Sequence, residues 1–264
     1  HFLNKQDYDV IKVSRTGKEG HQANLICDFE TDKLTQGAML GVDTVFHLAG
    51  YTHDVSNSKK SMERYVKLNI EATKDLATQA SKDGVKTFVF ISSVKAEISA
   101  NLQDKIQTKP ASIYGDTKRK AELELIELSR DTDMKILITR PSLVYGPDLK
   151  GNLLSMKNAI DSGWFPPLPV IKNSRSMVHV DDLVRAIFLI YEKGLDGEIY
   201  TVTDGNNYSS TEIYETFCKA LKKDPPKWRL PLFSLKMLSL VPGKLNKKIS
   251  KLVEDESYSS SKIE

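Results

Sequence analysis

Two apolar patterns alternate along the first half of the chain. Residues 44–48 and 87–92 are almost continuously apolar, which is typical of strands buried on both faces of a parallel sheet. Between such runs, apolar residues recur at spacings of three and four, which predicts helices. The predicted strands are 9–14, 24–28, 44–48, 87–92 and 134–143, and the predicted helices are 32–40, 61–83 and 113–129. Because strands and helices alternate, the pattern predicts right-handed crossovers and an α/β doubly wound parallel sheet.

The pattern changes after Tyr145-Gly-Pro147, where the apolar spacing becomes irregular and prolines cluster in 164–169. We therefore predict a main α/β domain at 1–147 and a smaller C-terminal lobe at 148–264. Strands at 176–180 and 198–203 and a helix at 181–193 suggest that 176–203 partly returns to the main sheet. A second helix, 210–221, follows Ser209 or Ser210 as its cap. The basic amphipathic stretch 232–248 is interpreted as a helix covering the lobe, in preference to a membrane-surface helix.

The composition is that of an ordinary globular protein, with 40% apolar and 28% charged residues. The 38 basic and 35 acidic residues give a net charge of only +3, so no nucleic-acid or membrane-surface partner is implied. No apolar run approaches the roughly 20 residues of a membrane span. Cys27 and Cys218 have no metal-ligand spacing, and no metal site is predicted. Both are expected to be buried or free thiols in a reducing compartment, and we expect a cytoplasmic protein.

Candidate chemistry lies where the predicted strands end, because ligands of α/β sheets bind beyond the carboxyl ends of the strands. Polar or small residues follow four strands: Ser14-Arg15, Asp28-Phe29, Leu48-Ala49-Gly50 and Ser92-Ser93. A helix that follows the last of these begins with Tyr114 and Lys118, which share one face one turn apart.

The Tyr-x-x-x-Lys spacing alone is weak evidence, because it occurs three times in the chain. Tyr8 and Lys12 straddle a predicted strand, on which four residues span roughly 13 Å. Tyr258 and Lys262 lie in a serine-rich tail. The middle pair is the one on a helix that follows a buried strand, so context favours it.

Five motifs occur in order along the chain, and a sixth matching segment, 175–183, lies in the lobe. The motifs are His47-Leu-Ala-Gly50, Asn69 in Leu-Asn-Ile-Glu-Ala-Thr, Ile91-Ser-Ser-Val-Lys-Ala96, Tyr114-x-x-x-Lys118 and Arg140-Pro-Ser-Leu-Val-Tyr-Gly-Pro147. Together they resemble extended short-chain dehydrogenase/reductases. More narrowly, they are similar to the NAD-dependent epimerase/dehydratase group of nucleotide-sugar enzymes, and to its UDP-sugar 4-epimerases. The resemblance implies a Rossmann-like fold with a C-terminal substrate lobe.

The resemblance implies a catalytic set of Ser93, Tyr114 and Lys118. A free tyrosine titrates near pH 10, but a lysine ammonium and a positive nicotinamide favour its phenolate. Tyr114 would then take the proton of a sugar hydroxyl while the cofactor accepts a hydride. Ser93 would orient the same hydroxyl, whereas Ser92 is interpreted as structural.

Binding residues follow from the same resemblance. The residues implied for the cofactor are Ser14, Arg15, Asp28, Phe29, Leu48, Ala49, Gly50, Asn69, Tyr114, Lys118 and Pro141. Those implied for the substrate are Ser93, Lys95, Asn152 and Arg175, of which the last two would contact the diphosphate. For Asn69 a purely structural amide stays an equal alternative.

The chain departs from the family pattern in three ways. It contains no Gly-x-x-Gly-x-x-Gly or Gly-x-Gly-x-x-Gly turn for a pyrophosphate. Its second strand ends in Ser14-Arg15 and not in an acidic residue, so NADP stays open beside NAD. It also ends earlier than relatives do. We therefore expect a piece that lacks a first strand, the glycine turn and a short C-terminal segment. We expect such a piece to bind dinucleotide poorly, and its parent to be a homodimer formed through the helices 61–83 and 113–129.

The leading functional hypothesis is a nucleotide-sugar 4-epimerase acting on a UDP-hexose or a UDP-N-acetylhexosamine. The alternative is an NADPH-dependent reductase of a keto-sugar or other carbonyl, for which Arg15 is the argument. A catalytically silent dinucleotide-sensing regulator is disfavoured, because Ser93, Tyr114 and Lys118 are all present.

Overall fold

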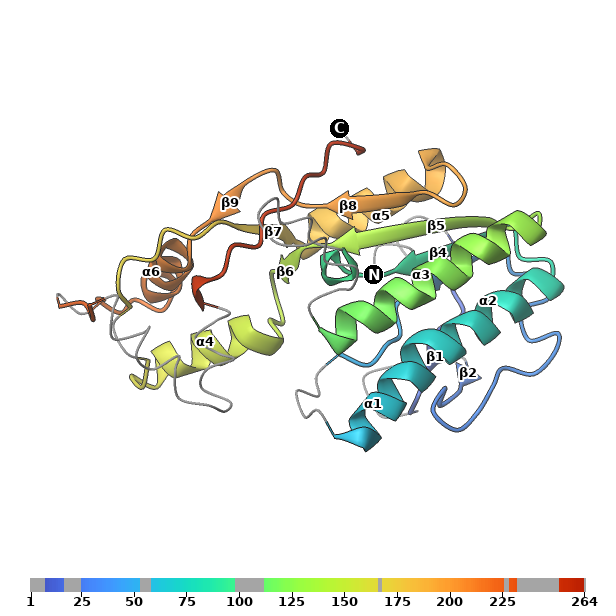
Figure 1. The fold of residues 1–264 in the computed structure, drawn as a ribbon, viewed down its shortest axis with the longest axis horizontal. Coiled ribbons are helices and arrows are strands. Elements are labelled where there is room, and N and C mark those ends of the chain that lie inside the picture. Colours follow the sequence, from blue (N-terminus) through green and yellow to red (C-terminus); the bar gives the residue numbers. More distant parts are fainter. Residues whose placement is uncertain are drawn as a thin grey trace, which may run out of the picture. The chain divides into compact units, whose positions relative to one another are not determined.

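The computed structural model describes residues 8–16, 25–52, 58–97, 112–165, 168–225, 228–231 and 252–263. The chain divides into two compact units, the first formed by 1–141 and 184–201 and the second by 142–183 and 202–262 (Figure 1). The predicted helix at 232–248 and the first four residues lie outside the described residues.

The first unit is built on a sheet with the strand order β3-β4-β5-β8. Its strands are β3 (Thr44–His47), β4 (Thr87–Ile91), β5 (Lys135–Pro141) and β8 (Ile199–Val202). β3, β4 and β5 are parallel, with Phe46 opposite Val89 and Val89 opposite Leu137. The first four residues of β4 are buried, as the continuous apolar run predicts. The parallel α/β fold is thereby confirmed.

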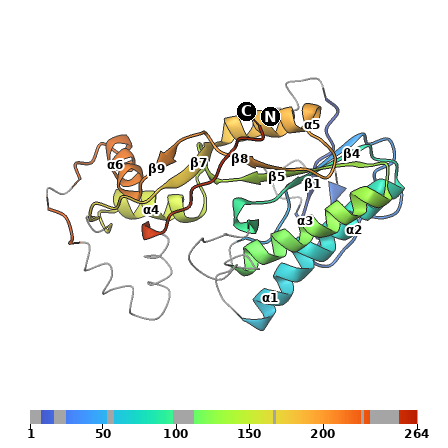
Figure 2. The ribbon, with the colours of Figure 1, turned by 45° about the horizontal axis from the view of Figure 1, so that its top comes forward.

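Helices cover both faces of this sheet (Figures 1 and 2). On one face, α1 (Lys59–Val66), a five-residue π-helical turn at Lys67–Glu71 and α2 (Ala72–Lys82) follow one another directly, and α3 (Ile113–Asp131) runs beside them. These helices and the sheet enclose the core, which includes Leu76, Phe88, Phe90, Leu125, Ile136 and Ile138. On the other face, α5 (Val180–Lys193) brings the rings of Phe188 and Tyr191 within 6.3 and 5.8 Å of the Phe46 ring.

β1 (Val13–Ser14) and β2 (Leu25–Ile26) form a separate two-stranded parallel sheet. Among the described strands, β1 pairs with β2 alone and β3 with β4 alone. Apolar side chains near β1 and β3 are exposed, among them Ile11 and Leu48.

The helix predicted at 32–40 is wrong, because 32–35 are irregular and 36–41 form turns. Gly37 adopts a φ of +82°, which does not fit a right-handed helix. The backbone N–H groups of Gly37 and Met39 donate to the Asp83 carboxylate, each at 3.0 Å, in place of helical partners. A tertiary contact therefore overrides the local apolar spacing.

The second unit has its own sheet and core. β6 (Leu143–Tyr145) pairs parallel with β7 (Arg175–His179), which pairs antiparallel with β9 (Asn207–Tyr208). Two helices share a core that includes Met156, Ile160, Tyr214 and Cys218: α4 (Gly151–Asp161), which the sequence analysis missed, and α6 (Ser210–Ala220). Ser209 caps α6 in a capping box with Glu212.

Two other predictions can be checked against the described residues. Cys27 and Cys218 are buried and form no disulfide, as predicted. No described helix has the length and apolarity that crossing a membrane requires.

Candidate functional site

Ser93 and Tyr114 come together at the carboxyl end of β4. Ser93 lies two residues beyond the strand and caps a short 3-10 helix at Val94–Ala96, accepting the N–H of Lys95 at 3.2 Å. Ser112 caps α3 and thereby places Tyr114 in its first turn. The hydroxyl of Ser93 hydrogen-bonds the phenol of Tyr114. Burial raises the pKa of Tyr114, and this hydrogen bond acts in the opposite direction.

Lys118 lies one helical turn beyond Tyr114 and is only 3% exposed. Its Nζ donates a hydrogen bond of 2.9 Å to the carbonyl oxygen of Ile91 and stands 4.5 Å from the ring centroid of Phe90. Burial lowers the pKa of Lys118 to about 8, while the negative charge of Glu122 raises it. The lysine is therefore held against the end of β4 by both a hydrogen bond and a cation–π contact.

Asn69 fixes the loop that follows β3. Its side chain is 1% exposed and lies in the π-helical turn. Oδ1 accepts the N–H of Tyr51 at 2.7 Å, and Nδ2 donates to the Tyr51 carbonyl and to Thr117 Oγ1, both at 3.1 Å. A Cβ added to Gly50 would lie 3.2 Å from both Asn69 Oδ1 and Lys118 Nζ. This glycine therefore lets the backbone after β3 approach the lysine closely.

A buried carboxylate joins α3 to the ends of β4 and β5. Glu122 is 0% exposed and accepts four hydrogen bonds. The donors are Ser92 Oγ at 2.6 Å, Arg140 Nε at 2.8 Å, Arg140 Nη2 at 2.7 Å and Arg119 Nη1 at 3.1 Å. Ser92 thus has a structural contact, in agreement with its interpretation from the sequence. The sequence analysis did not single out Glu122, although its position four residues after Lys118 on the same helix face was a usable signal.

The residues implied for the adenine end of a dinucleotide lie beyond β1 and β2. Asp28 Oδ1 accepts the N–H of Glu30 at 3.0 Å, and the ring of Phe29 meets that of His47 edge-on at 6.4 Å. Ser14 Oγ donates to the carbonyl of Thr16 at 3.0 Å, and Arg15 is exposed.

A dinucleotide fits some of these residues better than others. Leu48 is 70% exposed and is followed by exposed Ala49 and Gly50, so an apolar loop at the end of β3 is open to a ligand beside Lys118. The 264 residues contain no glycine-rich turn for a pyrophosphate. The nicotinamide and adenine ends therefore have suitable residues, whereas the pyrophosphate has none of the expected kind.

The remaining candidates are spread over both units. In the first unit, Lys95 is partly exposed and Pro141 is buried at the end of β5. In the second unit, Asn152 is exposed at the start of α4. Arg175 begins β7 with an 11% exposed side chain, and its Nη2 lies 3.2 Å from Glu256 Oε2.

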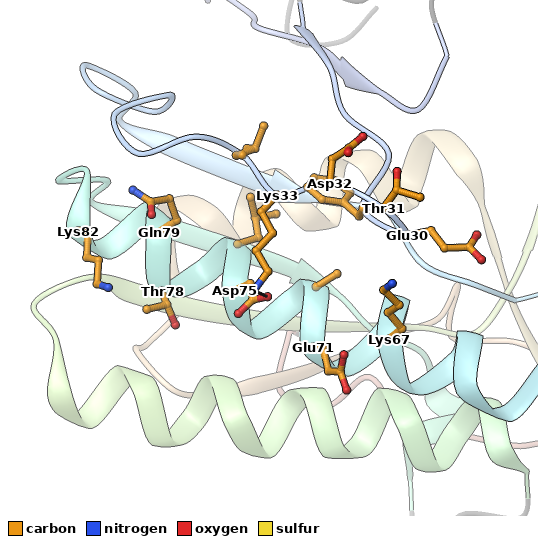
Figure 3. Close-up of a pocket in the computed structure, with 14 residues that line it drawn as sticks. Glu30, Thr31, Asp32, Lys33, Lys67, Glu71, Asp75, Thr78, Gln79 and Lys82 are labelled. Atoms are coloured by element: carbon orange, nitrogen blue, oxygen red, sulfur yellow. Dashed lines mark ion pairs between the residues drawn. The ribbon is translucent and has the colours of Figure 1, made fainter.

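A pocket of about 360 Å³ lies beside α2, between this helix and the segment that follows β2 (Figure 3). Charged side chains of both signs line it, and Lys33 Nζ lies 2.7 Å from Asp75 Oδ2. Phe29 also lines this pocket, but Ser93, Tyr114 and Lys118 do not. We therefore treat it as separate from the reacting groups. Among the residues that the structure describes, no cluster of His, Cys, Asp or Glu could hold a metal ion.

Comparison with known proteins assigns the chain to a family. The model of the NAD dependent epimerase/dehydratase family matches residues 1–203, a range that includes Ser93, Tyr114 and Lys118. The chain belongs to this family. UDP-glucose 4-epimerase from Vibrio cholerae is 30% identical over 242 residues, which are 88% of this chain and 69% of that protein.

Solved structures of epimerase/dehydratase relatives share the fold. The crystal structure of UDP-glucose 4-epimerase from Thermotoga maritima with UDP-glucose has a TM-score of 0.77 and 24% identity, and the match covers 99% of this chain and 85% of that one. MoeE5 in complex with UDP-glucose and NAD has a TM-score of 0.71 and 23% identity, covering 85% and 77%. The fold is thus Rossmann-like. The family match and the Vibrio cholerae relative make the chain an enzyme of the epimerase/dehydratase kind.

Proposed function

We propose that the chain carries the reaction centre of a nucleotide-sugar 4-epimerase, with a UDP-hexose or UDP-N-acetylhexosamine as substrate. One observation carries the proposal: the hydrogen-bonded Ser93 and Tyr114 stand at the end of β4, with Lys118 one turn beyond Tyr114. The similarity to the Vibrio cholerae UDP-glucose 4-epimerase supports the choice of substrate class.

Tyr114 is the proposed base for the 4-hydroxyl of the sugar. Burial raises the pKa of its phenol, so the phenol stays protonated unless a positive charge lies close. The Lys118 ammonium supplies such a charge on the same helix face. Ser93 already hydrogen-bonds the phenol, and in the proposed complex it shares this bond with the sugar hydroxyl and orients it.

NAD is the proposed cofactor, and when bound it would supply a reversible hydride acceptor for C4 of the sugar. The chain's own part is to hold the dinucleotide. Lys118 and Gly50 would hold its nicotinamide ribose side, and Asp28 and Phe29 its adenine side. Asn69 would act indirectly, because it fixes the backbone of Tyr51.

An NADPH-dependent carbonyl reductase is the second candidate, and one observation favours it. Arg15 is exposed directly beyond β1, where a guanidinium suits the 2′-phosphate of NADP. The two candidates differ in stoichiometry. The epimerase inverts C4 with no net use of cofactor, whereas the reductase consumes one NADPH per turnover.

For the sugar nucleotide we propose Lys95, Asn152 and Arg175 as contacts, the last two on the diphosphate. We also propose a homodimer formed through the helices at 61–83, which include α1 and α2, and at 113–129, in α3; the exposed apolar side chains of Met62 and Leu123 support it. The variant Leu123→Glu should then be a monomer in light scattering at a concentration where the unchanged chain is a dimer. Equal masses would refute the dimer.

The test of function is NMR of the sugar. UDP-glucose or UDP-N-acetylglucosamine is incubated with catalytic NAD⁺, and the H4 coupling is followed. Two proteins are compared: the chain itself, and a fusion that adds a designed strand and Gly-x-x-Gly-x-x-Gly turn before residue 1. Inversion at C4 by the fusion without stoichiometric NADH supports the epimerase. Net NADPH oxidation with a keto-sugar, and no inversion, would reject it.

A further inference from the structure

The network around Glu122 lies next to the reacting groups, because Ser92 and Ile91, which hydrogen-bond Glu122 and Lys118, are adjacent in the chain. A carboxylate with no exposure is costly to bury, and here four hydrogen bonds offset that cost. Arg140 binds it through two N–H groups, at 2.8 and 2.7 Å, which fixes both orientation and distance. The network is therefore a rigid junction between α3 and two strand ends.

The junction sits one helical turn below Lys118. Ser92, which donates to Glu122 at 2.6 Å, directly follows Ile91, whose carbonyl accepts the Lys118 ammonium at 2.9 Å. Ser93, the partner of Tyr114, is the next residue. Any shift of α3 along β4 would therefore move Lys118 away from the Ile91 carbonyl and Tyr114 away from Ser93.

We propose that Glu122, clamped by Arg140 and Ser92, is a positioning residue that seats Lys118 against the end of β4 and keeps it an ammonium. The inference rests on the proposed function, in which Lys118 must carry a positive charge beside Tyr114.

The balance of charges explains why Lys118 needs this support. Burial lowers its pKa to about 8, and the charge of Glu122 acts against that effect. The other charged or titratable groups that face this cluster are His47 on β3, Arg140 on β5, and Arg119 and Tyr114 on α3. Glu97 faces Arg140. The pKa of His47 is lowered to about 3 and that of Tyr114 is raised, so neither group changes charge near pH 8.

The consequence for Lys118 is large enough to measure. With a pKa of about 8, about nine in ten lysines are protonated at pH 7. A nearby opposite charge shifts a pKa by about one to three units, so its loss changes proton affinity roughly tenfold or more. Loss of the Glu122 charge would thus leave about half of the lysines neutral at pH 7.

The experiment is an NMR titration of the full, ligand-free chain labelled with ¹³Cε-lysine, in which the Lys118 signal is identified by its loss in Lys118→Met. The test variant is Glu122→Gln, which keeps the shape of the side chain and removes its charge. The matched control is Glu124→Gln on the same helix, whose carboxylate pairs with Lys74 at 2.5 Å. In Glu122→Gln we expect the pKa of Lys118 to fall by about one unit, which is a roughly tenfold loss of proton affinity. In the control we expect the pKa to stay unchanged.

An unchanged midpoint in Glu122→Gln, or an equal fall in the control, would overturn the proposal. If Glu122→Gln does not fold, the double variant Glu122→Gln with Arg140→Met replaces the whole buried pair by neutral groups, which proteins often tolerate. The loss of the Arg140 charge offsets part of the effect, so a smaller fall is expected there, and an unchanged Lys118 pKa also overturns the proposal. The titration needs neither substrate nor cofactor. Its result is therefore independent of the epimerase assay, and a failure of this inference can be distinguished from a failure of the proposed function.

Discussion

His47 makes the stability of the first unit depend on pH. His47 is 3% exposed, and its Nε2 lies 3.0 Å from Thr73 Oγ1. Its ring stacks on that of Phe90, with the ring centroids 5.7 Å apart. Burial, and then the charge of Lys118, lower its pKa to about 3 from the ordinary value of 6.5. The perturbation we consider is acidification from pH 7 to pH 5.

The sign follows from the direction of the pKa shift. Below pH 6.5 the unfolded chain binds a proton that the folded chain refuses, so stability is fully present above pH 6.5 and falls as the pH falls towards 3. Each pH unit in this window costs about 1.4 kcal/mol, so at pH 5 the loss is about 2 kcal/mol. The free energy of unfolding of a domain is about 5–15 kcal/mol, so this loss is a large fraction of it.

The assay is urea unfolding at pH 7, 6 and 5 followed by far-UV circular dichroism, for the unchanged chain and for His47→Gln. Glutamine can keep a hydrogen bond to Thr73 and cannot take up the proton. Trp164 and Trp228 both belong to the second unit, so their fluorescence is an internal reference. The control His179→Gln changes a partly exposed histidine of that unit and should leave the acid loss in place. If the unchanged chain and His47→Gln lose the same free energy between pH 7 and 5, the reasoning is wrong.

Three further predictions concern the site. Tyr114→Phe should lower turnover of the fusion protein by about 10²–10⁴-fold without changing its circular dichroism, and retained activity would remove Tyr114 as the base. Asn69→Ala should destabilise the first unit by about 1–3 kcal/mol in urea unfolding, since the backbone N–H of Tyr51 loses its buried partner, and an unchanged midpoint would contradict this role. Calorimetry of the 264-residue chain should show no saturable binding of NAD(H) at millimolar concentration, because the chain has no glycine turn. Tight binding would overturn that view.

The sequence predicts the buried strands and long helices because each follows from a local period. The continuous run at 87–92 could form only a doubly buried strand or a core helix, and Gly84 before it favours the strand. The missed helix α4 was also within reach, because Leu153, Met156 and Ile160 have helical spacing and are buried on one side. Motif order likewise led to Ser93, Tyr114 and Lys118.

Other features depend on contacts between distant residues and leave no local signal. The turns at 36–41 exist because Asp83, more than 40 residues away, accepts their N–H groups. Glu122 looks like one more charged residue of a helix until the ends of β4 and β5 bring Ser92 and Arg140 to it. The ion pair between Arg175 and Glu256 spans 81 residues in the same way.

The π-helical turn at Lys67–Glu71 has a consequence for comparing homologous sequences. A π turn holds one residue more than an α turn, so it works as a one-residue insertion inside an otherwise regular helix. A homologue with one residue fewer at this point could keep both α1 and α2, but the residues before the gap would be rotated by about 100° around the helix axis. A single-residue gap in an alignment here would therefore mark a real change in which side chain meets the loop after β3, and shifting the gap for a better score would misassign the counterpart of Asn69.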